Sequence, residues 1–144
     1  MSAKEKGLWS LQKPLIGYKK IACKCVNDQK WVSAIAKLEI PTGAIVVRPY
    51  RCFDDFDDFD DDGCFVQDEL RTDQCKTLEI IGKHPIDKKS CFSNYKSDFK
   101  FIEGEKQNSK LNTDIYKCMD MDGEDGIKFY TDIEKAKTSF IEIY

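Results

Sequence analysis

The sequence predicts an α+β fold, built mainly from a bent antiparallel β-sheet with one short C-terminal helix. Three observations support this prediction. Short runs of β-branched and aromatic residues alternate with turn residues along most of the chain. A single segment, close to the C-terminus, combines a helix-start pattern with apolar residues three or four apart. The length of 144 residues, 41% of them hydrophobic, is that of one domain with a substantial core.

We expect a single domain over residues 14–144, preceded by a flexible lead-in over residues 1–13 in which Trp9 alone is anchored. No internal repeat or composition shift marks a further boundary. No run reaches the ~20 apolar residues needed to span a bilayer. Because the N-terminus also lacks the apolar core of a signal peptide, we expect a protein that is not secreted.

Two strands are predicted in the N-terminal third. Alternating apolar residues over residues 15–26 favour a strand with a slip near Lys19 and Lys20, and NDQK then forms a turn. The stretch WVSAIAKLEI, residues 31–40, is the second strand, because PTG follows it at once. The β-branched run AIVVRPY resumes strand character after that turn.

Further strands are predicted after an acidic loop at residues 52–69. The stretch CKTLEII, residues 75–81, favours a strand that GKHP ends, and GIKFY, residues 126–130, favours another. KKSCFSNYKSD, residues 88–98, is expected to be a loop. The segment FKFIEG, residues 99–104, is short and alternating.

The clearest helix start is the T-x-x-E pattern of Thr131 and Glu134, a capping box that satisfies two backbone N–H groups. Apolar residues then recur three or four apart until Phe140, near which the helix is expected to end. The predicted core gathers the apolar residues of all these elements: Leu15, Tyr18, Ile21, Trp31, Ile35, Leu38, Ile45, Val47, Leu78, Ile80, Phe101, Ile127, Phe129 and Phe140.

The net charge of −3 conceals an uneven distribution. Seven of the nine residues from Asp54 to Asp62 are Asp, and without them 19 acidic residues remain against 23 basic ones. The acidity therefore belongs to one loop. The basic residues, mostly Lys, are scattered along the sequence, which argues against a nucleic-acid-binding protein.

Residues 58–69, DFDDDGCFVQDE, match the loop of a calcium-binding EF-hand at nearly every ligand position. The preceding segment contains Pro49 and shows no helical periodicity, whereas an EF-hand needs a helix there. An acidic loop is therefore the favoured interpretation, and calcium is the alternative. The candidate metal ligands are Asp58, Asp60, Asp62, Cys64 through its carbonyl, and Glu69.

The same loop is a candidate docking segment for a basic protein. Phe53, Phe56 and Phe59 recur every three residues within the acidic run, so one side of the loop is aromatic. The candidate partner-binding residues are Asp54, Asp55, Phe56, Asp57, Phe59 and Asp61.

Other candidate chemistry is sparse. Without a secretory signal, the seven cysteines are expected to be reduced thiols. Zinc would need four ligands from these cysteines and His84, yet only Cys23 and Cys25 lie close together, and we expect both in the core. His84, the only histidine, precedes Pro85 in a turn and is expected to be exposed. We therefore expect no cofactor, apart from the calcium alternative, and lean against an enzyme.

Four segments in order, AKLEIPTGAIVV, RTDQCKTLEIIG, FKFIEGE and GIKFYTDIEKA, resemble an uncharacterised domain of phages and large DNA viruses that is often attached to pentapeptide repeats. The resemblance spans about residues 18–140. It implies a viral origin, which agrees with the excess of Lys over Arg, and hence a location in the host cytoplasm or the virion.

The chain departs from that family in three respects. Lys128 stands where the family would have His, so any chemistry of that His is absent here. The acidic loop is an insertion relative to the family pattern, and the pentapeptide repeats are missing. The resemblance supplies no catalytic residues.

The sequence thus predicts a non-enzymatic viral interaction or virion-associated protein that contacts a protein partner through its acidic aromatic loop. Nucleic acid and membranes are not expected as partners. Two alternatives stay open: a calcium-binding protein with an EF-hand-like loop at residues 58–69, and an enzyme that acts on nucleotide or ADP-ribose groups.

Overall fold

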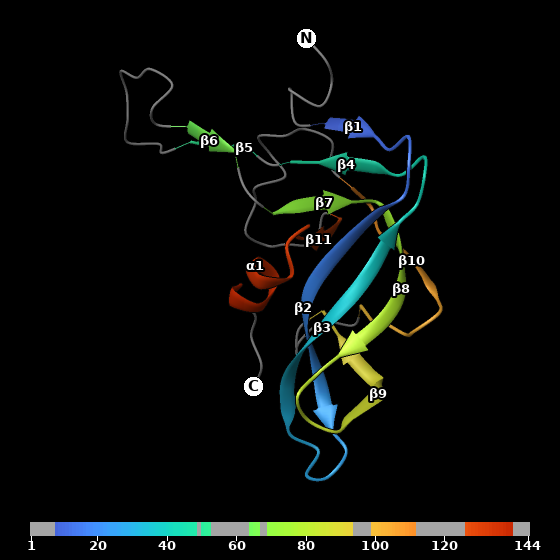
Figure 1. Cartoon of the computed structure of the whole chain (residues 1–144), viewed down its shortest axis with the longest axis vertical. Helices are drawn as coiled ribbons and strands as arrows, with labels where there is room; N and C mark the ends of the chain where they lie inside the picture. The colour runs from blue at the N-terminus through green and yellow to red at the C-terminus, as the bar shows by residue number, and fades with distance from the viewer. Residues whose placement is uncertain are drawn as a thin grey trace.

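In the computed structural model, the described residues are 8–48, 50–52, 64–66, 69–93, 99–111 and 126–139. They form mostly antiparallel strands and one helix (Figure 1). The elements are β1 (Leu8–Ser10), β2 (Leu15–Cys25), β3 (Trp31–Ile40), β4 (Ile45–Val47), β5 (Tyr50–Cys52), β6 (Cys64–Val66), β7 (Leu70–Thr72), β8 (Gln74–Ile81), β9 (Ile86–Phe92), β10 (Lys106–Asn108), β11 (Ile127–Phe129) and α1 (Ile133–Thr138).

The strands form two curled sheets and a separate hairpin (Figure 1). The five-stranded sheet has the order β10-β8-β3-β2-β9, the four-stranded sheet β1-β4-β7-β11, and the hairpin pairs β5 with β6. This confirms the prediction of a bent, mainly antiparallel fold with one short C-terminal helix. A single helix of six residues makes the described part mainly β, so the α+β label is loose.

The β2–β3 hairpin is the longest pairing, with ten consecutive Cα partners from Leu15 opposite Ile40 to Lys24 opposite Trp31. This register is continuous, so the slip predicted near Lys19 and Lys20 is wrong for the β3 side. The register of β2 shifts instead against β9, between Cys23 and Lys24. Lys20 is accommodated within the regular strand, and its ammonium donates to the Lys137 and Ser139 carbonyls at 3.0 and 3.2 Å.

Tyr18 and Tyr130 join the two sheets. Each backbone N–H donates to the carbonyl of the other residue, at 2.7 and 2.8 Å, which places β11 beside β2. Gly17 permits this close approach, since a Cβ atom at Gly17 would overlap the ring of Phe129. The junction therefore depends on a strand glycine with no side chain to obstruct the neighbouring strand.

The core lies between the sheets and is centred on Phe101, Phe129, Leu38 and Ile40. The other predicted core residues that are buried are Ile21, Ile35, Val47, Ile80 and Ile127. Four others are only half-buried, and Phe140 lies outside the described residues; the half-buried four are Leu15, Tyr18, Trp31 and Ile45.

Leu78 was expected in the core but is 38% exposed. The β3–β8 register shifts between Lys37 and Leu38, so Leu78 is the extra residue of a bulge. Thr77, which faces Leu38, occupies the buried position instead.

The predicted loop at residues 88–98 is wrong for its first part, where β9 forms the edge of the five-stranded sheet. Its ends pair with β2, while Lys88 to Ser90 bulge between them. Such polar, lysine-rich residues suit an edge strand, which sequence periodicity does not reveal. Within the expected lead-in, β1 pairs with β4, and Trp9 packs against the core.

Helix α1 starts one residue later than the capping box predicts. Asp132 is the N-cap, and its side chain accepts a hydrogen bond from the Glu134 N–H at 2.9 Å. The helix ends at Thr138, before the predicted end near Phe140, and Ser139 caps it. Its buried face is Ala136, and the helix packs against β2.

We predict that Asp132→Ala lowers the free energy of unfolding by about 1 kcal/mol, because the N–H of Glu134 loses its acceptor. Thr131→Ala is the matched control and should change stability by less than half of that amount. Urea denaturation of both variants tests this assignment. A larger loss of stability in the Thr131 variant would contradict Asp132 as the N-cap and support Thr131 instead.

Candidate functional site

The acidic loop connects the two strands of the separate hairpin. Cys52 and Cys64 are the last Cα partners, so the intervening residues 53–63 lead from β5 to β6. Figure 1 shows β5 and β6 standing away from both larger sheets, and neither strand pairs with them. The candidate partner-binding residues all lie outside the described residues: Asp54, Asp55, Phe56, Asp57, Phe59 and Asp61.

The candidate calcium ligands are only partly described. Asp58, Asp60 and Asp62 lie outside the described residues, and the backbone of Cys64 belongs to β6. Glu69 is described, and its Oε1 lies 3.8 Å from Nε of Arg71. Within the described ranges, no three His, Cys, Asp or Glu side chains gather into a metal-binding group.

Glu69 belongs to a cluster of charged side chains where β2, β7 and β11 meet. We call Lys19, Glu69, Arg71 and Lys128 the Glu69 cluster. Arg71 and Lys128 are direct Cα partners of β7 and β11, and Arg71 is only 4% exposed. Glu69 also attracts Lys19 and Lys128 electrostatically. Glu69 therefore attracts all three cations of the cluster.

Burial changes the proton affinity of these groups. Loss of hydration lowers the pKa of Lys19 from 10.5 to about 8, against the opposing attraction of Glu69. Burial lowers the pKa of Lys128 in the same way. Burial also raises the pKa of the neighbouring Cys75 thiol to about 12, so this thiol stays protonated and unreactive at neutral pH. The arrangement holds charge inside the sheet junction rather than activating a nucleophile.

The sequence analysis missed this cluster and assigned Glu69 only to calcium. No local signal marks these cations, because the alternation of Lys128 with Ile127 and Phe129, and of Arg71 with Leu70, is also the pattern of cations that face solvent. Sequence spacing does not show that β7 and β11 are neighbours.

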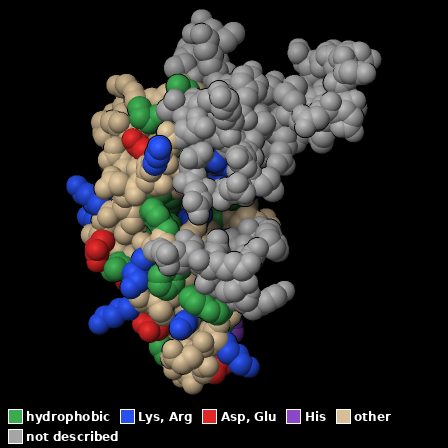
Figure 2. All heavy atoms as spheres, turned by 180° about the vertical axis from the view of Figure 1, so that it is seen from behind, with side chains coloured by type: hydrophobic (Ala, Val, Ile, Leu, Met, Phe, Trp, Pro, Cys, Tyr) green, Lys and Arg blue, Asp and Glu red, His purple; other side chains and the backbone are tan. Residues whose placement is uncertain are grey.

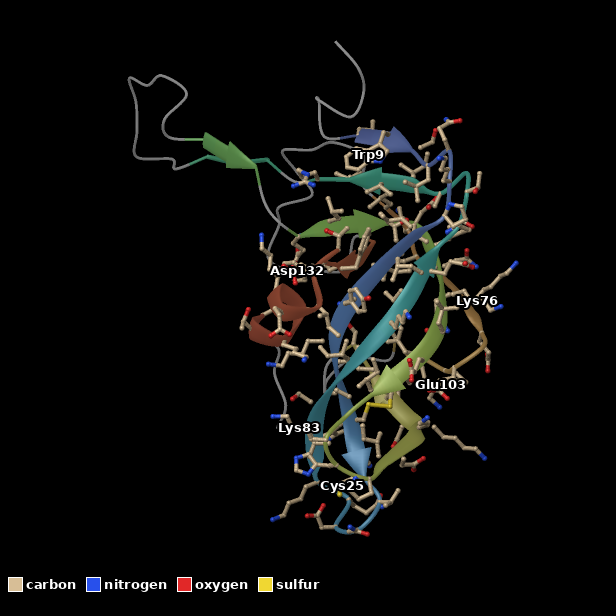
Figure 3. All side chains as sticks on the ribbon, viewed as in Figure 1. Trp9, Cys25, Lys76, Lys83, Glu103 and Asp132 are labelled. Atoms are coloured by element: carbon tan, nitrogen blue, oxygen red, sulfur yellow. A yellow bond between two sulfur atoms is a disulfide. The ribbon has the colours of Figure 1, made fainter. Side chains whose placement is uncertain are left out.

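Cys23 and Cys91 form a disulfide across β2 and β9 (Figure 3). They are direct Cα partners, 4.1 Å apart, and both are buried. The expectation of reduced thiols is therefore wrong for this pair, because the β9 pairing that aligns them was not foreseen. Cys25 and Cys75 are buried free thiols. Cys23 and Cys25 are both buried, which confirms their predicted place in the core. His84 is exposed in the β8–β9 connection, as expected.

The described body is cationic even though the chain is acidic. Across the described ranges, 19 residues are Lys or Arg and 10 are Asp or Glu, whereas the whole chain has 23 and 26. Figure 2 shows basic side chains projecting around the lower end of the molecule, beside the histidine. The acidic residues are thus concentrated in sequence segments outside the described strands.

No family model, curated protein or solved structure matches this chain. Among the described residues, no helix has the length and apolar character required to cross a membrane.

We predict that the burial of Lys19 makes stability depend on alkaline pH. The unfolded chain keeps the Lys19 proton up to a pKa of 10.5, whereas the folded protein releases it near pH 8. The unfolded state therefore binds more protons in this window, and stability rises with pH.

Lys19→Met removes this titration while keeping an apolar stem. Relative to the Lys19→Met variant, the original protein should gain on the order of 2 kcal/mol in unfolding free energy from pH 8 to pH 10. Urea denaturation at several pH values measures this difference. A difference that does not change with pH would contradict the burial of the Lys19 ammonium.

We predict that reduction of the Cys23–Cys91 disulfide lowers the free energy of unfolding by about 2–4 kcal/mol, because the unfolded chain loses a long-range constraint. Urea denaturation with and without a phosphine reductant measures the loss. The double variant Cys23→Ala/Cys91→Ala should show no response to reductant. A response of equal size in that variant would assign the effect to other cysteines.

Proposed function

We propose that this protein is a non-enzymatic binding protein whose acidic loop, residues 54–62, contacts a basic protein partner. One observation carries the proposal: the strands that flank the loop form their own two-stranded hairpin, outside both sheets of the body. Because the hairpin pairs with neither larger sheet, a partner that contacts it need not separate any strand of those sheets.

The distribution of charge supports the same proposal. Seven aspartates within nine residues create a strongly negative segment on a body whose described part is cationic. Opposite charge on a partner steers association and selects the partner. Phe53, Phe56 and Phe59 would add apolar contacts, which supply affinity that charge alone does not give.

We also propose an origin and a location for the protein. Its resemblance to a viral domain and its excess of Lys over Arg support a viral origin and a place in the host cytoplasm or the virion.

The test uses two synthetic peptides, one of alternating lysine and leucine and one of alternating lysine and serine. The protein should bind the lysine–leucine peptide more tightly, because only this peptide offers both positive charge and apolar side chains. The triple variant Asp57→Asn/Asp58→Asn/Asp60→Asn should bind it about tenfold more weakly. Calorimetric titration at about 0.15 M salt, where distant charges are screened, measures both affinities.

The matched control removes three charges from another acidic segment, in Asp120→Asn/Asp122→Asn/Asp125→Asn. This variant should keep the affinity of the original protein within about twofold. Equal losses in both triple variants would reduce the effect to net charge and refute a contact at residues 54–62. Unfolding free energies unchanged within about 0.5 kcal/mol would show that both variants keep the fold.

A further inference from the structure

A pair of aromatic rings lies on one face of the five-stranded sheet, near the β2–β3 turn. The rings of Trp31 and Phe92 meet edge to face, with centroids 6.0 Å apart and planes at 70°. Trp31 lies opposite Lys24 across β2 and β3, and Phe92 lies opposite Ala22 across β9 and β2. Residues 22 and 24 share one side of β2, so both rings stand on that side.

A lysine ammonium lies over each ring. Nζ of Lys24 lies 5.4 Å from the centroid of Trp31, and Nζ of Lys100 lies 5.5 Å from that of Phe92. Both rings are partly exposed, and Lys100 is exposed. We call Lys24, Trp31, Phe92 and Lys100 the Trp31 face.

Among the described residues around the Trp31 face, lysines outnumber carboxylates. Asp87 is the nearest carboxylate in register, opposite Lys24, and it already accepts a hydrogen bond from the Lys89 N–H at 3.0 Å. Lys83, labelled near the lower end of the molecule in Figure 3, stands in the adjacent β8–β9 connection. The exposed lysines of the turns and edge strand at this end are Lys30, Lys83, Lys88 and Lys89; Lys88 is paired with Glu103 at 3.0 Å, and Asp28 is an exposed carboxylate of the β2–β3 turn.

We propose that the Trp31 face binds single-stranded nucleic acid. Flat aromatic rings stack with bases of any sequence, and lysine ammonium groups bind the phosphates between the bases. A duplex keeps its bases stacked inside, and an acidic peptide offers carboxylates without a row of flat rings. Only a single strand supplies both exposed flat bases and phosphates along one chain.

Binding would replace the cation–π contacts of the two lysines with contacts between the rings and the bases. In the unbound protein, Lys24 and Lys100 cover the rings through cation–π contacts, which are weak at exposed sites. Their side chains can swing away from the rings to reach phosphates, and a base then takes the vacated ring surface. The lysines thus keep the rings partly shielded from water until the ligand arrives.

The scattered lysines of the sequence argued against nucleic-acid binding, and the Trp31 face argues for it. The pairing of β2 with β3 and β9 brings together residues as far apart as Lys24 and Phe92. The Trp31 face is also independent of the acidic hairpin, because the two surfaces share no residue.

The most direct reporter is the fluorescence of Trp31 itself. The chain has two tryptophans, so Trp9→Phe leaves Trp31 as the single one without altering the proposed site. Oligothymidylate of about twelve nucleotides should quench this fluorescence as bases stack on the ring. Poly-aspartate of matched charge and a duplex of equal length should produce little quenching.

Two substitutions separate stacking from charge in anisotropy titrations with labelled oligothymidylate. Trp31→Leu keeps apolar bulk but removes the flat ring, and should weaken binding at least about fivefold with an unchanged salt slope. Lys24→Gln/Lys100→Gln should reduce the slope of log affinity against log salt by about 1.4, for two phosphate contacts. The control Lys13→Gln/Lys106→Gln removes two exposed lysines outside the face and should change neither quantity.

Three results would overturn the proposal. The first is the absence of quenching in the Trp9→Phe protein, which does not depend on how the other variants fold. The second is equal quenching by poly-aspartate, which would identify a surface for acidic peptides. The third is a loss of affinity in the Lys13/Lys106 control as large as in the Lys24/Lys100 variant, which would indicate non-specific attraction.

Discussion

Strand β2 is the element on which the other described features depend. It pairs with β3 over ten residues, with β9 near its end, and with Tyr130 through Tyr18. The approach of β11 requires Gly17, because any side chain there would meet Phe129. The same strand then supplies Lys19 to the Glu69 cluster, Cys23 to the disulfide and Lys24 to the Trp31 face. A change in the position of β2 would therefore disturb three sites at once.

Charged residues are distributed unevenly in this protein, both within the Glu69 cluster and along the whole chain. Inside the sheet junction, Glu69 attracts cations whose charged form burial disfavours, and this role competes with its assignment to calcium. At the level of the whole chain, the described residues include most of the lysines, while the run from Asp54 to Asp62 contains a large share of the acidic residues. The two proposed partners, a basic protein and a single strand of nucleic acid, match these opposite charges.

Sequence patterns predicted those parts of the fold that local chemistry determines. The strand over residues 31–40 was predicted with its observed bounds, because β-branched residues fill it and PTG ends it. Strand β9 was missed because an edge strand needs no apolar periodicity. Leu78 was wrongly predicted to be in the core, because the bulge in β8 turns its side chain to the exposed side of the sheet. The disulfide, the Glu69 cluster and the Trp31 face depend on register between distant strands, and Cys23 and Cys91 are 68 residues apart.

Carbodiimide cross-linking to the lysine–leucine peptide, followed by mass spectrometry, is the most direct test of the central claim that residues 54–62 form the partner contact. The reagent joins a carboxylate to an amine only where the two touch, so it reports the contact itself. The account predicts cross-links concentrated on the aspartates of residues 54–62. Cross-links concentrated on the acidic residues of the segment 114–125, or spread evenly over the carboxylates of the chain, would contradict it.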